Sequence, residues 1–288
     1  MKFGLMFCNV GSYADPKPAA ALAQAAEAAG FDSLWTVEHI VVPGGYQSKY
    51  PYAASGKMPG DERTISLSDP LIWMTYVAAA TSRIKLATGV IILPEHNPLL
   101  CAKQVATLDR LSGGRVILGV GVGWLKEEFD AMGVAFEPRG RMTDEYIAAM
   151  RELWTAEAPC HEGEFVRFKD AYMRPKPTNR ALPIVIGGHT KAAARRAGRL
   201  GDGFFPARGA TSELLELARS TAREHGRDPG AIEITAVAPE DMSKIPELAR
   251  AGVHRVVVPV MGRPEFKQTV TGPDDLLGWR ETIERYAG

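Results

Sequence analysis

Arg115-Val-Ile-Leu-Gly-Val-Gly-Val-Gly-Trp124 joins a β-branched, apolar strand to three glycines at alternate positions. A helical pattern, Leu125-Lys-Glu-Glu-Phe-Asp-Ala-Met132, follows at once. Glycine weakens a strand because it costs entropy and adds no packing, so its repeated use indicates that something approaches the strand closely. Two interpretations stand: a flat ligand lies against the strand end, or the strand is tightly packed in a barrel.

Short β-branched runs alternate with amphipathic helical stretches along the chain. Eight strands are predicted, at 2–7, 33–37, 84–92, 116–120, 184–186, 203–206, 232–236 and 256–260. Helices are predicted at 18–29, 70–82, 98–111, 141–156, 190–200, 212–225, 243–251 and 274–286. Eight β-then-α units in 288 residues favour an α/β fold, a closed (β/α)8 TIM barrel forming one domain over 1–288. A doubly wound open sheet is the alternative.

Two insertions interrupt the repeat. Val42–Leu67 follows the second strand and is rich in Gly, Pro, Tyr and Ser, and Pro159–Asn179 follows the fourth and contains a hairpin pattern at Glu162–Phe168. Chemistry in an α/β barrel sits on loops that follow strand ends, so the first insertion is expected to be a lid over the site. A disordered surface loop is the alternative.

Composition narrows the function classes. Basic and acidic residues number 34 each, which gives no electrostatic case for binding nucleic acid or an anionic membrane. No apolar run approaches the roughly 20 residues that span a bilayer, and the N-terminus has the pattern of a strand instead of a signal peptide. We therefore expect a cytoplasmic protein. Cys8, Cys101 and Cys160 are widely spaced and without CxxC pairing, which is typical of ordinary thiols.

The second strand ends in Trp35-Thr-Val-Glu38-His39, which places a carboxylate next to an imidazole. Histidine is the side chain best poised for proton transfer near neutral pH, so Glu38 and His39 are the catalytic candidates. A structural histidine is the alternative. Neighbouring strand residues face opposite sides, so both enter the site only if the strand has already ended.

The fifth strand runs into Gly187-Gly188-His189-Thr190 and then a helix beginning at Lys191. Backbone N–H groups at a helix N-terminus favour an anion, and Thr190 and Lys191 add donors, so a phosphate site is predicted. A tight barrel turn is the alternative. Walker A, GxSxG, HExxH and tight His/Asp patterns are missing, and no metal site is predicted.

Together these motifs resemble the bacterial luciferase-like flavin and deazaflavin oxidoreductases. The resemblance covers nearly the whole chain, through LWTVEHI, TGVIILPEHNP, SGGRVILGVGVGWLKEEFDAMGV and PIVIGGHTKAAARRAGRLGDGFFP. GVGVGWLKEEFDAMG followed by Arg139-Gly-Arg141 is most similar to the probable F420-dependent branch. The resemblance implies a barrel with insertions, coenzyme F420 or alternatively FMN at its C-terminal mouth, and a homodimer or higher homo-oligomer.

The resemblance also implies residue roles. His39 would donate or accept a proton with Glu38 beside it, and Gly89-Val90 would form a non-prolyl cis peptide. Cofactor contacts are expected from Gly89, Val90, Val122, Gly123, Glu127, Gly187, Gly188, Thr190 and Lys191. Trp124 replaces the glutamate of the sugar-phosphate branch, which argues against that reaction. Trp124 would instead line the substrate pocket with Tyr46, Tyr50 and Tyr52.

The expected function is hydride transfer between F420 and a small organic substrate. The nearest alternative is an FMN-dependent monooxygenase, in which reduced flavin reacts with oxygen before attacking the substrate. A cofactor-free binding protein on the same barrel is a second alternative, because a fold does not determine a function.

Overall fold

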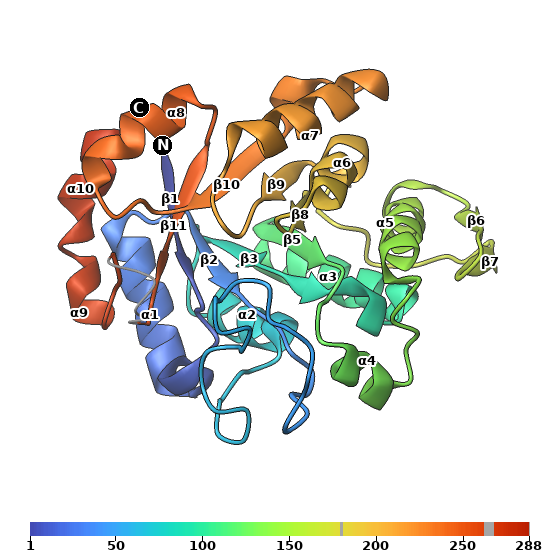
Figure 1. The fold of residues 1–288 in the computed structure, drawn as a ribbon, viewed down its shortest axis with the longest axis horizontal. Helices are drawn as coiled ribbons and strands as arrows, with labels where there is room; N and C mark the ends of the chain where they lie inside the picture. Colours follow the sequence, from blue (N-terminus) through green and yellow to red (C-terminus); the bar gives the residue numbers. More distant parts are fainter. Residues whose placement is uncertain (179–180, 262–267, 288) are drawn as a thin grey trace.

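The computed structural model describes residues 1–178, 181–261 and 268–287, and in these ranges parallel strands close into a barrel with helices around it (Figure 1). The strand order is β3-β2-β1-β11-β10-β9-β8-β5-β4, and a pairing between β3 and β5 completes the circle. β4 continues the third strand position, so eight positions form the barrel. This confirms the (β/α)8 prediction, and the open-sheet alternative is wrong.

The barrel strands agree with the predicted ones except at the third, which is divided in two. They are β1 (Lys2–Met6), β2 (Ser33–Thr36), β3 (Lys85–Thr88), β4 (Ile91–Ile92), β5 (Val116–Gly121), β8 (Ile184–Gly187), β9 (Gly203–Phe205), β10 (Glu233–Val237) and β11 (Arg255–Pro259).

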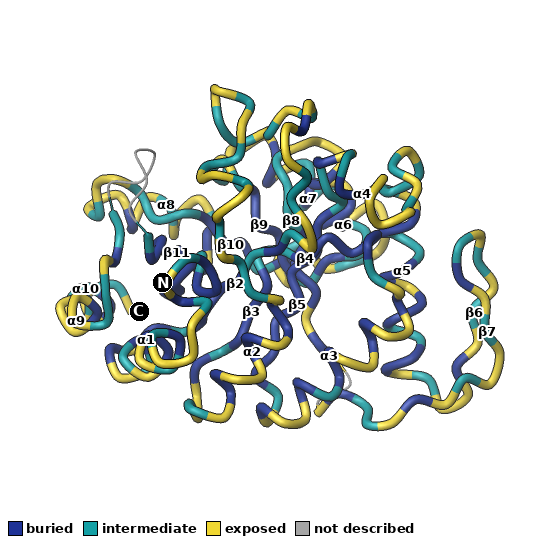
Figure 2. The backbone as a smooth tube through the Cα atoms, turned by 90° about the horizontal axis from the view of Figure 1, so that it is seen from below, coloured by how far each residue is buried: buried dark blue, intermediate teal, exposed yellow. Residues whose placement is uncertain are grey.

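All eight predicted helices are present with some shifted ends, the last of them is divided in two, and the pattern at Leu125–Met132 forms a further helix. They are α1 (Pro16–Ala29), α2 (Pro70–Ala78), α3 (Pro98–Ser112), α4 (Lys126–Met132), α5 (Arg139–Thr155), α6 (Lys191–Leu200), α7 (Ser212–Glu224), α8 (Ile245–Arg250), α9 (Pro273–Leu276) and α10 (Trp279–Tyr286). Short 3-10 turns are η1 (Gly11–Ala14), η2 (Leu93–Glu95), η3 (Pro229–Ala231) and η4 (Met242–Lys244). The strands are buried while the helices expose their outer faces (Figure 2). None of the described helices is long and apolar enough to cross a membrane.

The break in the third strand explains two of the glycines that opened the sequence analysis, Gly119 and Gly121, and also explains Gly187. The Gly89-Val90 peptide is cis, as the resemblance implied. A Cβ atom on Gly121 would lie 2.7 Å from the Val90 side chain, and one on Gly187 would lie 2.5 Å from it. A Cβ atom on Gly119 would lie 1.8 Å from the Thr88 carbonyl oxygen. Close packing of protein atoms therefore accounts for these three glycines without a ligand.

Side chains fill the barrel interior. The inner cluster consists of Met6, Trp35, Ala87, Ile117, Val185, Phe205 and Val257. The end where the strands begin is closed by Arg255, whose fully buried guanidinium pairs with Asp32 at 2.7 Å and with Glu233. The interior is thus a packed core instead of a pore, and in such barrels the site lies at the end where the strands finish.

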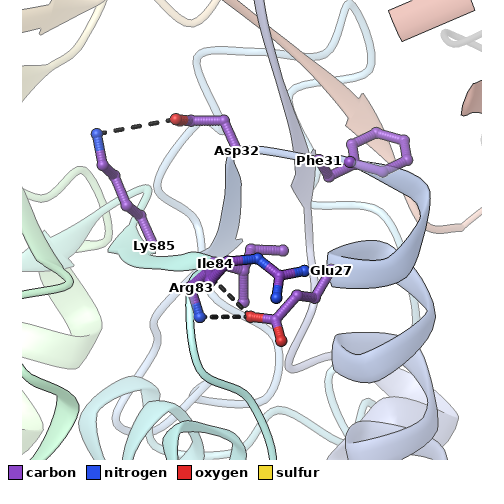
Figure 3. Close-up of a pocket in the computed structure, with 7 residues that line it drawn as sticks. Glu27, Phe31, Asp32, Arg83, Ile84 and Lys85 are labelled. Carbon is purple, nitrogen blue, oxygen red and sulfur yellow. Dashed lines mark hydrogen bonds and ion pairs between the residues drawn. The ribbon is translucent and has the colours of Figure 1, made fainter.

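A hollow of about 270 Å³ lies beside that closed end, at the start of β2 and β3 (Figure 3). Its polar walls are already engaged: Lys85 lies 3.8 Å from Asp32, and Glu27 accepts hydrogen bonds from the backbone of Ser82, Arg83 and Ile84. These bonds lower the pKa of Glu27 to about 2 although partial burial opposes them. The hollow lies between α1 and the barrel, at the opposite end of the barrel from His39.

The two insertions differ in position. Val42–Leu67 lies between β2 and α2, and its end is tied to the β1 side by the bridge between Val10 and Leu67. The predicted hairpin is β6 (Cys160–Glu162) and β7 (Arg167–Lys169), which follows α5 and projects beside it (Figure 1). The segment that directly follows β5 carries α4 instead. Asn179, the last residue of the predicted second insertion, lies outside the described residues.

Candidate active site

His39 is held by a carboxylate that the sequence analysis did not select. β2 ends at Thr36, so Glu38 and His39 lie in the following loop at the barrel mouth. His39 Nδ1 lies 2.6 Å from Oε2 of Glu128, a fully buried side chain of α4. The other oxygen, Oε1, accepts hydrogen bonds from the N–H groups of Ile40 and Val41 at 2.6 and 3.1 Å. Glu128 therefore fixes both the His39 ring and the backbone beside it.

Glu38 was the second catalytic candidate and was expected to assist His39. Its carboxylate does not orient the His39 ring. Its carboxylate accepts a hydrogen bond from the Ile92 N–H at 2.6 Å and pairs with His96 Nε2 at 3.0 Å. Burial alone would lower the pKa of His96, but the hydrogen bond and charge of Glu38 outweigh burial and raise it. The Glu38–His96 pair thus connects the end of β2 to the segment after β4.

A third glutamate, Glu95, lies among these pairs and was not predicted. Its side chain is buried, and neither carboxyl oxygen has a hydrogen-bond partner within the described residues. Burial raises its pKa to about 9, and the charges of Glu128 and Glu38 add to the increase. A buried carboxyl group in this setting favours the neutral form.

Trp124 is the centre of an aromatic cluster that joins His39 to the Val42–Leu67 insertion. Its ring packs edge-on against His39 with centroids 5.7 Å apart, and against Tyr46 and Tyr50 at 5.6 and 5.1 Å. Tyr52 extends the cluster through Tyr50 at 5.3 Å. All four residues predicted for the substrate pocket are therefore assembled beside His39.

Tyr46 has a structural role in this cluster. It is buried, and its hydroxyl oxygen accepts a hydrogen bond from the Met58 N–H at 2.8 Å. The Lys57 ammonium donates to the Tyr46 carbonyl at 2.6 Å and lies over the Tyr46 ring. These bonds order the insertion, so the disordered-loop alternative is not supported. Trp124, Tyr50 and Tyr52 are only partly buried.

Glu127 latches the insertion to α4. Its Oε1 accepts hydrogen bonds from the N–H groups of Gln47 and Ser48 at 2.7 and 3.1 Å. The Ser48 hydroxyl and these amides lower the pKa of Glu127 to about 2. Oε2 is buried without a hydrogen-bond partner in the described ranges, so the expected cofactor contact would have to use that oxygen. We call the Glu127, Gln47 and Ser48 group the insertion latch.

The predicted phosphate-binding turn already uses several of its donors. From the sequence, the Gly188 N–H group was expected to be exposed. This group instead donates a hydrogen bond to the Phe205 carbonyl at 3.3 Å. Thr190 caps α6 by accepting from the Ala193 N–H at 3.1 Å, and Lys191 pairs with Glu213 at 2.7 Å. That ion pair is exposed and therefore weak. The first-turn amides of Lys191 and Ala192 have no acceptor within the helix and remain the donors for an anion.

Arg208, just after β9, adds positive charge near this turn and was missed in the sequence. Its N–H donates to His189 Nδ1 at 3.3 Å, and the Arg208 charge adds to burial in lowering the pKa of His189. Arg208 also acts electrostatically on Tyr52, although burial dominates and raises the pKa of that tyrosine. Tyr52 of the insertion therefore lies within electrostatic range of the segment that follows β9.

Gly123 has a packing role at the same rim. Its φ of +81° favours glycine, and a Cβ atom there would lie 2.5 Å from the Phe129 ring. Val122 and Gly123 are partly exposed at the mouth, where the resemblance expects them. No cluster of His, Cys, Asp or Glu with metal-binding geometry occurs among the described residues.

A closed α/β barrel with an oriented histidine and an aromatic cluster at its mouth places the chain among the barrel proteins whose sites lie on the loops after the strands. Residues 1–285 match the luciferase-like monooxygenase family, and the chain belongs to that family.

Individual relatives agree with this assignment. An uncharacterized protein of Mycobacterium tuberculosis is 37% identical over 250 residues, 85% of this chain and 87% of the relative. The FMNH2-dependent dimethylsulfone monooxygenase of Pseudomonas putida is 32% identical over 188 residues, 64% of this chain and 47% of the relative. The F420-dependent tetrahydromethanopterin reductase of Methanopyrus kandleri shares the fold with a TM-score of 0.73 at 19% identity, covering 99% of both chains. A sequence relative of the chain is thus named for FMN, and a protein of the same fold is named for F420.

Proposed function

We propose that the protein is an F420-dependent oxidoreductase that transfers hydride to or from a small organic substrate, with His39 as the proton donor or acceptor. The observation that carries this proposal is the 2.6 Å contact between His39 Nδ1 and Glu128. A carboxylate on Nδ1 holds the proton there and leaves Nε2 for the reaction. Such an arrangement suits a proton that accompanies hydride transfer.

The mouth fits a planar cofactor with an acidic tail. The Gly89-Val90 segment lies at the mouth between β3 and β4, and His39 and Trp124 lie at the same rim. The α6 N-terminus and Arg208 supply positive potential at the phosphate side. A bound deazaflavin would supply the hydride chemistry itself. Val90 would lie behind the ring, Lys191, Ala192 and Arg208 would hold the tail, and the insertion would exclude water.

Trp124 shapes the substrate side in this proposal. A neutral indole cannot act as an acid or base, so proton transfer falls to His39. The ring edges around Trp124 form an apolar wall with Tyr50 and Tyr52. Walls of this kind favour a small organic substrate of low charge.

Direct titration tests the cofactor. Purified protein is titrated separately with F420 and with FMN while ligand fluorescence is recorded. Saturable binding of F420 at micromolar or lower concentration, with FMN much weaker, is expected. Tight binding of FMN alone would contradict the F420 assignment. Failure of both to bind would favour a cofactor-free binding protein.

An FMN-dependent monooxygenase is the second candidate. The observation that favours it is the 32% identity to the Pseudomonas putida monooxygenase. Oxygen consumption separates the two functions. An F420 oxidoreductase is expected to work equally well without oxygen, whereas a monooxygenase consumes one molecule of oxygen for each molecule of substrate.

A further inference from the structure

We propose that Glu95 is a neutral carboxylic acid in the folded protein and is a positioning residue for His39, acting through Glu128. The inference rests on the proposed function in one respect, because the proposed function assigns the proton-transfer step to His39. The protonation state of Glu95 is a property of the chain itself. It can be tested without cofactor or substrate.

Three glutamates lie at the barrel mouth, and two of them have hydrogen-bond partners. Glu128 accepts hydrogen bonds from Ile40 and Val41 and binds His39. Glu38 accepts from Ile92 and pairs with His96. Each of these two side chains therefore has at least one backbone donor and one imidazole partner.

Glu95 has no such stabilisation. It is 6% exposed, and both of its oxygens lack a hydrogen-bond partner in the described part of the chain. The charges that act on it are those of Glu128 in α4 and Glu38 after β2, and the adjacent His96 is itself bound to Glu38. An ionised Glu95 would be a buried, unpaired charge beside two like charges. Its pKa of about 9 agrees with this geometry.

A neutral Glu95 has a consequence for the groups that hold His39. Glu128 contacts the His39 ring and the backbone beside it, and Glu38 contacts His96. Ionisation of Glu95 would add an unpaired charge that repels both carboxylates. Protonation of Glu95 therefore favours the position in which Glu128 holds His39.

The same assignment predicts a dependence of stability on pH. The ordinary pKa of glutamate, 4.5, applies to the unfolded chain, whereas the folded value is about 9. Between these values the folded chain holds a proton that the unfolded chain has lost. Stability from this group therefore falls as pH rises from about 4.5 to about 9. A paired glutamate with a lowered pKa would contribute a constant stability over this range, because it is ionised in both the folded and the unfolded chain.

Thermal unfolding of Glu95→Gln tests this trend. Relative to wild type, the Tm of the variant is expected to rise by about 3 °C or more between pH 5 and pH 8. Glu27→Gln is the matched control, because Glu27 has a pKa of about 2 and its loss should lower Tm throughout that range. Glu95→Met, also neutral and of similar length, repeats the test if the glutamine variant does not fold. The proposal is overturned if the Tm difference between variant and wild type does not change with pH. It is also overturned if the Tm of the variants falls relative to wild type as pH rises.

The influence on His39 is tested by NMR titration of its imidazole in the cofactor-free protein. The wild-type ring signals are expected to show an additional inflection near pH 9, which Glu95→Gln abolishes. Glu95→Asp is expected to retain an alkaline inflection. Identical titration curves for wild type and Glu95→Gln would show that Glu95 does not act on His39. F420 binding is a separate measurement, so failure of the cofactor assignment would leave these results interpretable.

Discussion

At the scale of single residues, the site depends on which of two adjacent glutamates faces inward. Glu127 was expected to contact the cofactor, yet it binds the insertion, while Glu128 binds His39. The helical pattern contained a signal for this: Leu125, Glu128 and Phe129 lie three or four positions apart and are all buried. A carboxylate on a buried helix face requires a partner, which here is an imidazole on another element.

The His39–Glu128 pair predicts a graded loss of activity. His39→Ala is expected to lower turnover by about 10²–10⁴-fold, the usual contribution of general acid–base catalysis, and to affect cofactor affinity less. Glu128→Gln should reduce turnover by a smaller factor, because an amide oxygen can still accept from the Ile40 and Val41 N–H groups. Steady-state kinetics and cofactor titration of both variants provide the measurements. Unchanged turnover in His39→Ala would remove its proton-transfer role.

The sequence was enough to select His39 but not its partners. Glu38 precedes His39 in the chain, yet its carboxylate turns to His96, 58 positions away. Glu95 and Arg208 gave no local signal, because their significance comes from burial and from neighbours on other elements. Contacts of this range depend on the tertiary fold, which strand and helix periodicity does not encode.

At the scale of elements, the insertion latch determines how the mouth is covered. Val42–Leu67 contains no regular helix or strand, and its order comes from hydrogen bonds and from the aromatic cluster around Trp124. The latch joins the middle of the insertion to α4, and the segment next to Leu67 is held by the Ser68 N–H to Asn9 carbonyl bond at 3.1 Å.

Breaking the latch is expected to loosen the insertion. Glu127→Ala removes hydrogen bonds to a charged group, and we expect amide hydrogen exchange at 45–58 to accelerate by about tenfold, equivalent to about 1.4 kcal/mol. Asp130→Ala on the same helix breaks only the exposed Lys126–Asp130 pair and serves as the control. Because the pKa of Glu127 is about 2, wild-type protection should persist down to pH 4. Equal exchange in the two variants would contradict the latch.

The elements themselves were largely predictable. Asp69 and Asn97 cap α2 and α3 as their sequence positions before proline indicated. The exception is the third strand, predicted as continuous over 84–92 but divided at Gly89-Val90. A run of β-branched residues predicts extended backbone on both sides of the division, so periodicity alone could not locate it.

At the scale of the whole molecule, an apolar surface on α2 and α3 agrees with the expected homo-oligomer. Ile72 and Tyr76 of α2 are 71% and 48% exposed, and Leu100 of α3 is 57% exposed. Exposed apolar side chains gathered on neighbouring helices are typical of subunit contacts. We propose a homodimer in which a second copy of the chain covers this surface.

Light scattering tests the homodimer. Wild-type protein is expected to elute at twice the chain mass of 31.2 kDa, and Ile72→Glu combined with Leu100→Glu should shift it to one chain mass. Leu277→Glu introduces a charge at a side chain that is 59% exposed on another part of the surface, and it should leave the mass unchanged. A wild-type monomer, or a dimer insensitive to the double substitution, would refute this arrangement.

Arg255 and the packed interior close the end of the barrel where the strands begin. If a cofactor and a substrate react at the mouth as proposed, both must approach from the side where the strands finish. A cofactor that lies beneath the substrate would then have to bind before it and leave after it. An ordered sequence of binding and release would follow from the architecture of the barrel.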